Sequence, residues 1–171
     1  MSLDLYIESN TPVQHKGTGV YIRENGETKE LLTKEEVLKH FPDANPDDIQ
    51  ENIYEDYRYF HCNITHNFTT MAEICNIQGN YKSHKGKRVS LYDLMWHPYE
   101  HLNITHPTFE YLEDLENCYS LLLNKPKFFE KLNPKNGWGT YKELVVKTKV
   151  FIDALHSISL EFENYKIVSD T

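Results

Sequence analysis

The chain has 171 residues, 39% of them hydrophobic and 26% charged, which fits one globular domain with a sizeable core. Its formal net charge of −8 excludes extensive binding to a nucleic-acid backbone, because such binding depends on many neutralised phosphates. No stretch reaches the roughly 18 uncharged apolar residues of a membrane span, and MSLDLYIESN lacks the regions of a signal peptide. We therefore expect a cytoplasmic protein without membrane contact.

The first sixty residues predict strands interrupted by short helices. Residues 2–7, SLDLYI, alternate apolar and polar side chains and predict a strand. A β-hairpin is predicted around Asn25-Gly26, the dipeptide suited to a type I′ turn. Thr33 lies three residues before Glu36, the spacing of a capping box, and predicts a short helix that Pro42 ends.

Two further elements lead to the middle of the chain. Asn45-Pro46 predicts a second short helix, with asparagine as the cap and proline in the first turn. The run YEDYRYF, residues 54–60, predicts a strand that leads directly into a polar segment.

That segment, HCNITHNFTTMAEICNI at 61–77, predicts a crossing from strand to helix. Its apolar residues recur with helical spacing, at Phe68, Met71, Ala72 and Cys75. Side chains of Asn63, Thr65 and Asn67 are of the types that accept hydrogen bonds from free amides in a first helical turn, which commonly contributes about 1 kcal/mol. Capping accounts for the asparagines and threonines of the segment but not for its histidines.

A second copy of the pattern His-x-Asn-Ile-Thr-His occurs at 101–106, HLNITH. It predicts the same transition, with Thr105 or Thr108 as the cap and Pro107 in the first turn. The buried face of the following helix is expected to consist of Phe109, Leu112, Leu115, Tyr119 and Leu122.

The remaining third of the chain predicts two helices and a closing strand. KFFEKL after Pro126 is expected to form a short helix, and NPKNGWGTY at 133–141 an irregular loop. A longer helix then has one apolar face, made of Tyr141, Leu144, Val145, Ile152 and Leu155. ISLEF at 158–162 alternates and predicts the last strand. The expected fold is α+β in a single domain, 1–171: a small, mostly antiparallel sheet (N-terminal strand, hairpin, strand before NITHN, C-terminal strand) covered by several helices.

Four motifs occur in a fixed order: MSLDLY at the start, NITHN at 63–67, LMWHP at 94–98 and FFEKLNPKNGWGTY at 128–141. In this order the chain resembles a family of small uncharacterised proteins encoded by many tailed phages and some bacteria. The family has no settled activity, so the resemblance implies matched positions rather than a function. These are Asn63, His66, Asn67, Trp96, Pro98, Asn133, Asn136, Gly137, Trp138 and Gly139.

Against the pattern of this family, residues 15–55 and 80–90 resemble insertions, and His97 stands where relatives have arginine. The second insertion contains the basic run KSHKGKR at 82–88, with His84 able to add charge at low pH. This run is either a solvated loop or a mobile lid over an anionic ligand.

A ligand site is predicted where two polar helix starts meet. Trp138 lies between two glycines just before a helix start at Thr140, where outward amides suit a phosphate and the indole can stack on a base. We expect His66 and Trp138 to line one pocket for a nucleotide-like anion, closed by the basic loop. The residues expected to bind this ligand are Asn63, His66, Asn67, Trp96, Asn136, Gly137, Trp138, Gly139, Lys85 and Arg88. The alternative is a Trp138 that only fills the gap between sheet and helix.

Metal and thiol chemistry are weaker alternatives. Ligand-type side chains are present at His61, Cys62, His66, His97, His101 and His106. However, no HExxH or CxxC motif occurs, and Pro98 disfavours a regular helix that would place His97 and His101 on one face. A Cys62–His66 nucleophile pair has no third orienting group. We expect no metal, no cofactor and reduced cysteines.

Three classes of function follow from these observations. The first is a binding protein that sequesters an anionic, nucleotide-derived signal, which in a phage setting would be a counter-defence sponge in the host cytoplasm. The second is an enzyme on such a ligand, with His66 as acid or base. The third is an acidic interaction protein that docks a host factor. The oligomeric state is open, and a homo-oligomer is one alternative.

Overall fold

The computed structural model describes residues 2–24 and 27–170. The chain divides into two compact units: unit 1, Met1–Asn10 with Arg58–Thr171, and unit 2, Thr11–Tyr57. The range 15–55, which resembles an insertion, lies within unit 2. The architecture is α+β, which confirms the predicted fold class.

Unit 1 is built on a three-stranded sheet in the order β4-β1-β7. The strands are β1 (Ser2–Gly17), β4 (Asn52–Thr65) and β7 (Tyr165–Asp170), and β1 and β4 each continue into unit 2. β7 pairs antiparallel with β1, and Ile7 lies opposite Ile167. Alternate side chains of β1 are buried, as the sequence predicts.

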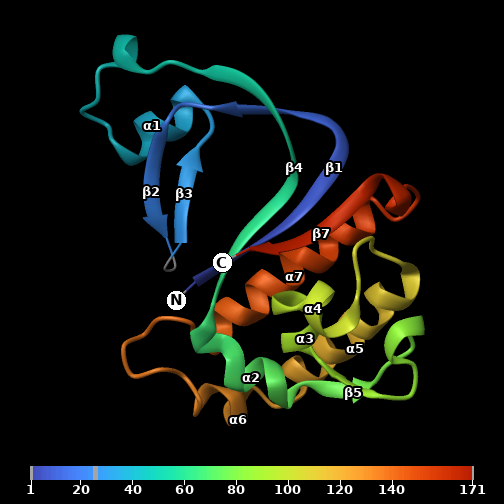
Figure 1. Cartoon of the computed structure of the whole chain (residues 1–171). Coiled ribbons are helices and arrows are strands. Elements are labelled where there is room, and N and C mark those ends of the chain that lie inside the picture. The colour runs from blue at the N-terminus through green and yellow to red at the C-terminus, as the bar shows by residue number, and fades with distance from the viewer. Residues whose placement is uncertain (1, 25–26, 171) are drawn as a thin grey trace. The chain divides into compact units, whose positions relative to one another are not determined.

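The helices of unit 1 lie to one side of this sheet (Figure 1). They are α2 (Thr69–Ile74), α3 (Leu91–Trp96), α4 (Pro98–Leu102), α5 (Phe109–Asn124), α6 (Pro126–Glu130) and α7 (Tyr141–Ser157), with a small hairpin of β5 (Asn76–Gln78) and β6 (Arg88–Ser90). Trp96, Tyr111, Phe68 and Phe151 are the largest fully buried side chains. Among the described helices, none combines the length and apolarity that crossing a bilayer requires.

Unit 2 is a hairpin with a short helix. β2 (Val20–Glu24) pairs with β3 (Glu27–Leu31), which confirms the hairpin, while the turn predicted at Asn25-Gly26 lies outside the described residues. α1 (Lys34–His40) is capped by Thr33, whose hydroxyl accepts from the Glu36 N–H. The Glu36 carboxylate accepts from the Leu32 N–H, one residue earlier than a capping box requires.

A 3₁₀ helix, Pro46–Asp48, forms where the second short helix is predicted, with Asn45 as its cap. Among the described residues of unit 2, three hydrophobic residues are buried in its core: Leu31, Val37 and Ile49.

The closing strand predicted at 158–162 is wrong. α7 is followed by turns and a 3₁₀ helix, Phe162–Asn164, and the pairing strand begins only at Tyr165. Ile158 and Phe162 are buried, whereas Leu160 is 91% exposed. The alternating apolar residues of ISLEF therefore lie where the chain reverses direction, and the strand that pairs with β1 follows them.

The predicted second strand-to-helix transition is also wrong. His101 and Leu102 end α4, and Asn103 takes the left-handed conformation, φ 52°, that often terminates a helix. Thr108 caps α5 by accepting from the Tyr111 N–H, so Pro107 precedes the cap instead of lying in the first turn. Phe109 is exposed, and the buried face of α5 includes Tyr111 and Cys118 in addition to its leucines.

Candidate functional site

The NITHN segment crosses from strand to helix as predicted. β4 ends at Thr65, and the chain continues through a 3₁₀ turn, His66–Phe68, into α2. The Thr65 hydroxyl caps this turn by accepting from the Asn67 N–H at 3.3 Å. Met71 and Cys75 are buried beneath it.

The two asparagines of this segment do not cap the helix, which corrects the prediction for both. Asn63 donates its side-chain amide to Asp4 Oδ1 at 3.1 Å, and His61 Nε2 lies 2.9 Å from the same oxygen. Burial acts to raise the pKa of Asp4, but these two hydrogen bonds outweigh it and lower the pKa below its ordinary value. Asn63 and His61 therefore hold β4 to β1.

Asn67 instead joins the NITHN turn to the NGWG loop. Its side-chain amide donates to the Trp138 carbonyl at 3.2 Å. Gly139, at φ 76°, packs so closely that a Cβ there would lie 2.7 Å from the Asn67 Cβ and 2.8 Å from the Thr65 Cγ2. The two motifs that the sequence analysis combined are thus in direct contact, with His66 half-buried and Trp138 45% exposed.

Most polar groups of the NGWG loop are engaged within the protein. Asn136 Oδ1 accepts from the Trp138 N–H at 3.0 Å, and a carboxylate oxygen of Glu143 accepts from the Gly139 N–H at 3.1 Å. Asn133 Oδ1 accepts from the Tyr141 N–H at 2.7 Å. The amides expected to bind a phosphate therefore already have acceptors, and one acceptor is itself anionic, which disfavours a second anion there.

Trp96, predicted as a ligand contact, is fully buried. Its ring packs edge-on against Phe68 and stacks on Tyr92, so the indole belongs to the core of unit 1.

The basic loop at 82–88 is fastened to α5 through one buried side chain. His84, predicted to lie in a solvated loop or a mobile lid, is only 2% exposed, and its Nε2 lies 2.7 Å from Asp114 Oδ2. Lys82, Lys85 and Lys87 are exposed around it. The loop continues into β6 at Arg88, which is also exposed.

Arg88 and His101 line the same pocket, which has a volume of about 450 Å³. Glu73, Asn76, Ser90, Tyr92 and Asp93 complete its polar lining. His101 Nδ1 donates to Asp93 Oδ1 at 2.7 Å, and Asp93 Oδ2 accepts from both the amide and the hydroxyl of Ser90. Burial acts to raise the pKa of Asp93, but the bonds from His101 and Ser90 outweigh it and lower that pKa.

A second histidine lies beside His101. The rings of His97 and His101 stack with centroids 4.5 Å apart, and Tyr92 Oη is 2.9 Å from His97 Nε2. The sequence predicts that Pro98 disfavours a regular helix through both histidines. α4 begins at Pro98, where the missing N–H is harmless, and His97 lies just before it as the N-cap residue. Burial, together with the charges of Glu73 and Asp93, raises the pKa of Tyr92.

Within residues 2–24 and 27–170, no group of three or more His, Cys, Asp or Glu side chains is arranged to hold a metal ion. All three cysteines are free and buried, and burial raises the pKa of the Cys75 thiol to about 12. Such a thiol is a poor nucleophile at neutral pH, because the thiolate is the reactive form.

The sequence predicts Arg88 as a ligand contact and presents His101 only as a candidate metal ligand. The spacing of Asp93 and His101, eight residues apart across two short helices, carries no local signal for their pairing. Comparison of the chain with models of protein families, with curated proteins and with solved structures gave no significant match in any of the three.

Proposed function

We propose that this protein binds a small, nucleotide-like anion in the pocket lined by Arg88 and His101. The observation that supports this most is the convergence of an arginine and a histidine on one pocket of about 450 Å³. Small-molecule sites commonly have volumes of about 300 to 1,000 Å³, so the cavity has room for a mononucleotide.

Both side chains are available to a ligand. Among the described residues, the Arg88 guanidinium has no carboxylate partner within ion-pair distance. Asp93 holds the Nδ1–H of His101, which leaves Nε2 as the ring nitrogen that meets a ligand. Arginine and protonated histidine both donate hydrogen bonds to phosphate oxygens.

The two carboxylates of the lining disfavour an anion that offers them no hydrogen-bond donors. Asp93 already accepts three hydrogen bonds, whereas Glu73 contributes a second carboxylate to the same cavity. A ligand with a phosphate at one end and hydrogen-bond donors at the other matches this distribution, with Asn76 and Glu73 facing the donors. A nucleotide with an exocyclic amino group has both features, and inorganic phosphate has only the first.

The test is calorimetric titration of the full chain with cyclic AMP and cyclic CMP at neutral pH. Arg88→Ala should weaken binding by about tenfold or more, since a charge-assisted hydrogen bond contributes roughly 1.5 to 3 kcal/mol. His101→Ala should also weaken binding, because it removes the ring nitrogen that Asp93 leaves available to the ligand.

Lys87→Ala is the matched control, because it removes one cation from the same loop without touching the pocket lining. Equal weakening by Lys87→Ala and Arg88→Ala would reduce the effect to general electrostatics and overturn the proposed site. Trp138→Ala and His66→Ala, in the same titration, test whether the ligand binds instead at the NITHN and NGWG loops. Loss of binding in these two variants alone would place the ligand on the joined NITHN and NGWG loops, which the Asn67–Trp138 contact favours as the second candidate.

Nucleotide recovered unchanged from the titration would make the protein a binder, and a new product would make it an enzyme. Binding without turnover fits sequestration of a host nucleotide signal, the role that the resemblance to phage-encoded proteins favours.

A further inference from the structure

Unit 2 carries most of the net negative charge of the chain. Between Thr11 and Tyr57 there are eleven acidic and five basic side chains, whereas the rest of the chain has fifteen and thirteen. The excess negative charge is thus concentrated in a small unit in whose described part three hydrophobic residues form the buried core.

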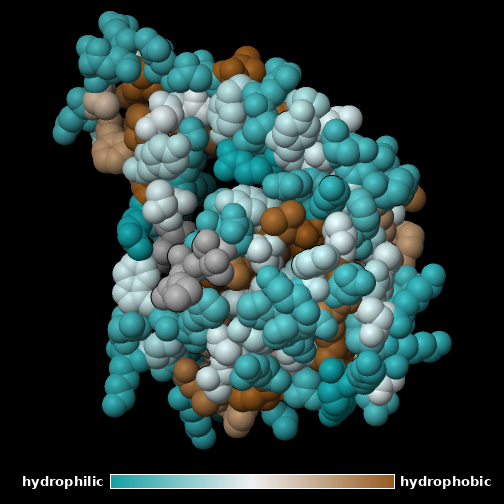
Figure 2. Space-filling model, viewed as in Figure 1, coloured by the Kyte–Doolittle hydropathy of each residue, from teal (hydrophilic) through white to brown (hydrophobic). Residues whose placement is uncertain are grey.

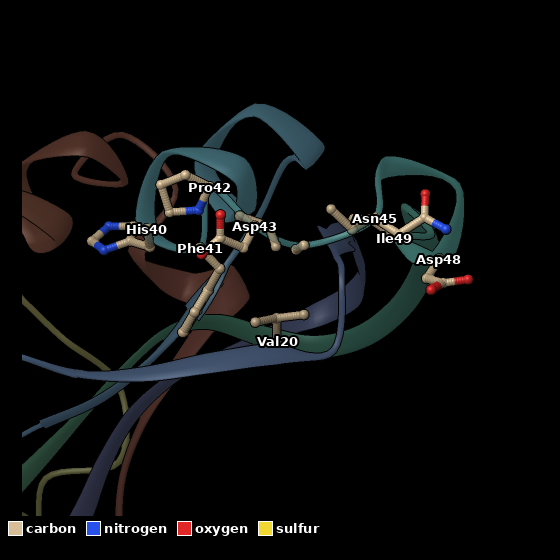
Figure 3. Close-up of a pocket in the computed structure, with 10 residues that line it drawn as sticks. Val20, His40, Phe41, Pro42, Asp43, Asn45, Asp48 and Ile49 are labelled. Atoms are coloured by element: carbon tan, nitrogen blue, oxygen red, sulfur yellow. The ribbon is translucent and has the colours of Figure 1, made fainter.

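A largely apolar pocket of about 730 Å³ opens within this unit. Val20 on β2 faces the segment that runs from His40 to Ile49 (Figure 3). Val37 and Ile49 belong both to the core of the unit and to the pocket lining, so the pocket continues the core outward. In Figure 2, brown apolar residues show at the surface of unit 2 among teal polar ones.

The local sequence explains why the pocket stays open. α1 ends at His40, and the Phe41 N–H completes the last turn by donating to the Val37 carbonyl. Pro42 cannot continue the helix, and the chain turns to the Asn45 cap of the next 3₁₀ helix. Phe41 remains 46% exposed at the rim.

Two carboxylates complete the lining. Asp43 and Asp48 are exposed members of the pocket wall, and Asp48 lies at the far end of the lining from His40 (Figure 3). An apolar depression with acidic margins is complementary to a cationic segment that carries an apolar side chain.

We propose that unit 2 docks a cationic amphipathic segment of a partner protein. One large apolar side chain of that segment enters the pocket beside Val20 and Phe41, and its lysines or arginines face Asp43 and Asp48. Burial of a leucine-sized side chain contributes most of the affinity. The surrounding negative charge speeds association and favours a partner segment of positive charge. The docking surface is independent of the nucleotide site, which lies wholly in unit 1.

The probe is a fluorescein-labelled amphipathic helical peptide of lysine and leucine, titrated with the full chain and followed by anisotropy at 0.15 M salt. Two companion peptides replace every lysine with glutamate or every leucine with serine. The lysine–leucine peptide should bind, and both companions should bind at least about tenfold more weakly, because each lacks one half of the complementarity.

The variant Asp43→Lys/Asp48→Lys should weaken binding by about tenfold or more, and Phe41→Ser by a similar factor. Glu55→Lys/Glu113→Lys is the matched control: it makes the same change in net charge at exposed positions outside the pocket. Equal loss in the control and the pocket variant would reduce the effect to net charge and overturn the docking surface. Equal affinity of the serine peptide would contradict the apolar contact. In an NMR titration with the lysine–leucine peptide, chemical-shift changes at amides away from Val20, Phe41 and Ile49 would overturn the proposed surface.

Discussion

A single carboxylate, Asp114, organises the loop that follows β5. It is fully buried on α5 and accepts hydrogen bonds from the backbone N–H groups of Asn80 and Tyr81 and from His84 Nε2. Tyr81 stacks on the His84 ring. The basic run therefore hides a polar cluster that fixes where the chain enters β6, and with it the position of Arg88.

We predict that Asp114→Ala destabilises the protein by about 3 to 5 kcal/mol, because it leaves a buried histidine and two amides without their acceptor. Urea denaturation followed by circular dichroism measures the loss. Glu113→Ala, at the exposed neighbouring position, should change the free energy of unfolding by less than about 0.5 kcal/mol. Similar midpoints for the two variants would show that the cluster contributes little to stability.

The strand-to-helix turn of NITHN and the NGWG loop pack against each other. Gly137 and Gly139 both have positive φ, 75° and 76°, so an alanine at either position meets a similar backbone penalty. Their surroundings differ, because a Cβ at Gly137 meets open space and a Cβ at Gly139 meets Asn67 and Thr65. This pair of glycines separates backbone strain from packing of one loop on the other.

We predict that Gly137→Ala costs about 1 to 2 kcal/mol and that Gly139→Ala costs about 1 to 3 kcal/mol more, since the NITHN turn must move to admit the methyl group. Thermal and urea unfolding of the two variants measure the difference. Equal destabilisation would show that the NITHN turn moves to admit the methyl group at little cost. The close packing of the two motifs would then not explain why both occur in the chain.

The whole molecule combines two units with unequal cores. Unit 1 has a continuous apolar cluster that runs from β1 through α3, α5 and α7, whereas the core of unit 2 is limited to Leu31, Val37 and Ile49. The free energy of local opening rises with buried apolar contacts, so the two units should differ in protection even though β1 and β4 pass through both.

We predict that amides of β2 and β3 exchange with deuterium at least about a hundredfold faster than those of α5 and α7 at neutral pH. Mass spectrometry of peptides after timed exchange measures this difference. Protection of the hairpin equal to that of α7 would show that the units unfold together.

Local sequence signals predicted the starts of several elements correctly. Thr33, Asn45, Thr65 and Thr140 cap the helical turns that follow them, because each bond joins residues two or three apart and depends only on nearby backbone. The same signals failed at 101–106, where a matching six-residue pattern ends a helix that Pro98 begins. The same pattern therefore precedes a helix at 61–66 and ends one at 101–106, because a strand leads into the first copy and a helix into the second.

The sequence by itself determined the α+β class, the hairpin, the capped helix starts and the concentration of acidic residues between Thr11 and Tyr57, since these follow from periodicity, composition and short-range bonds. Only the tertiary structure decided which polar groups meet. Asn67 with Trp138, His84 with Asp114 and His101 with Asp93 are paired across 71, 30 and 8 positions. Such pairs form only when packing of the apolar core closes the intervening chain, and no local pattern encodes that closure.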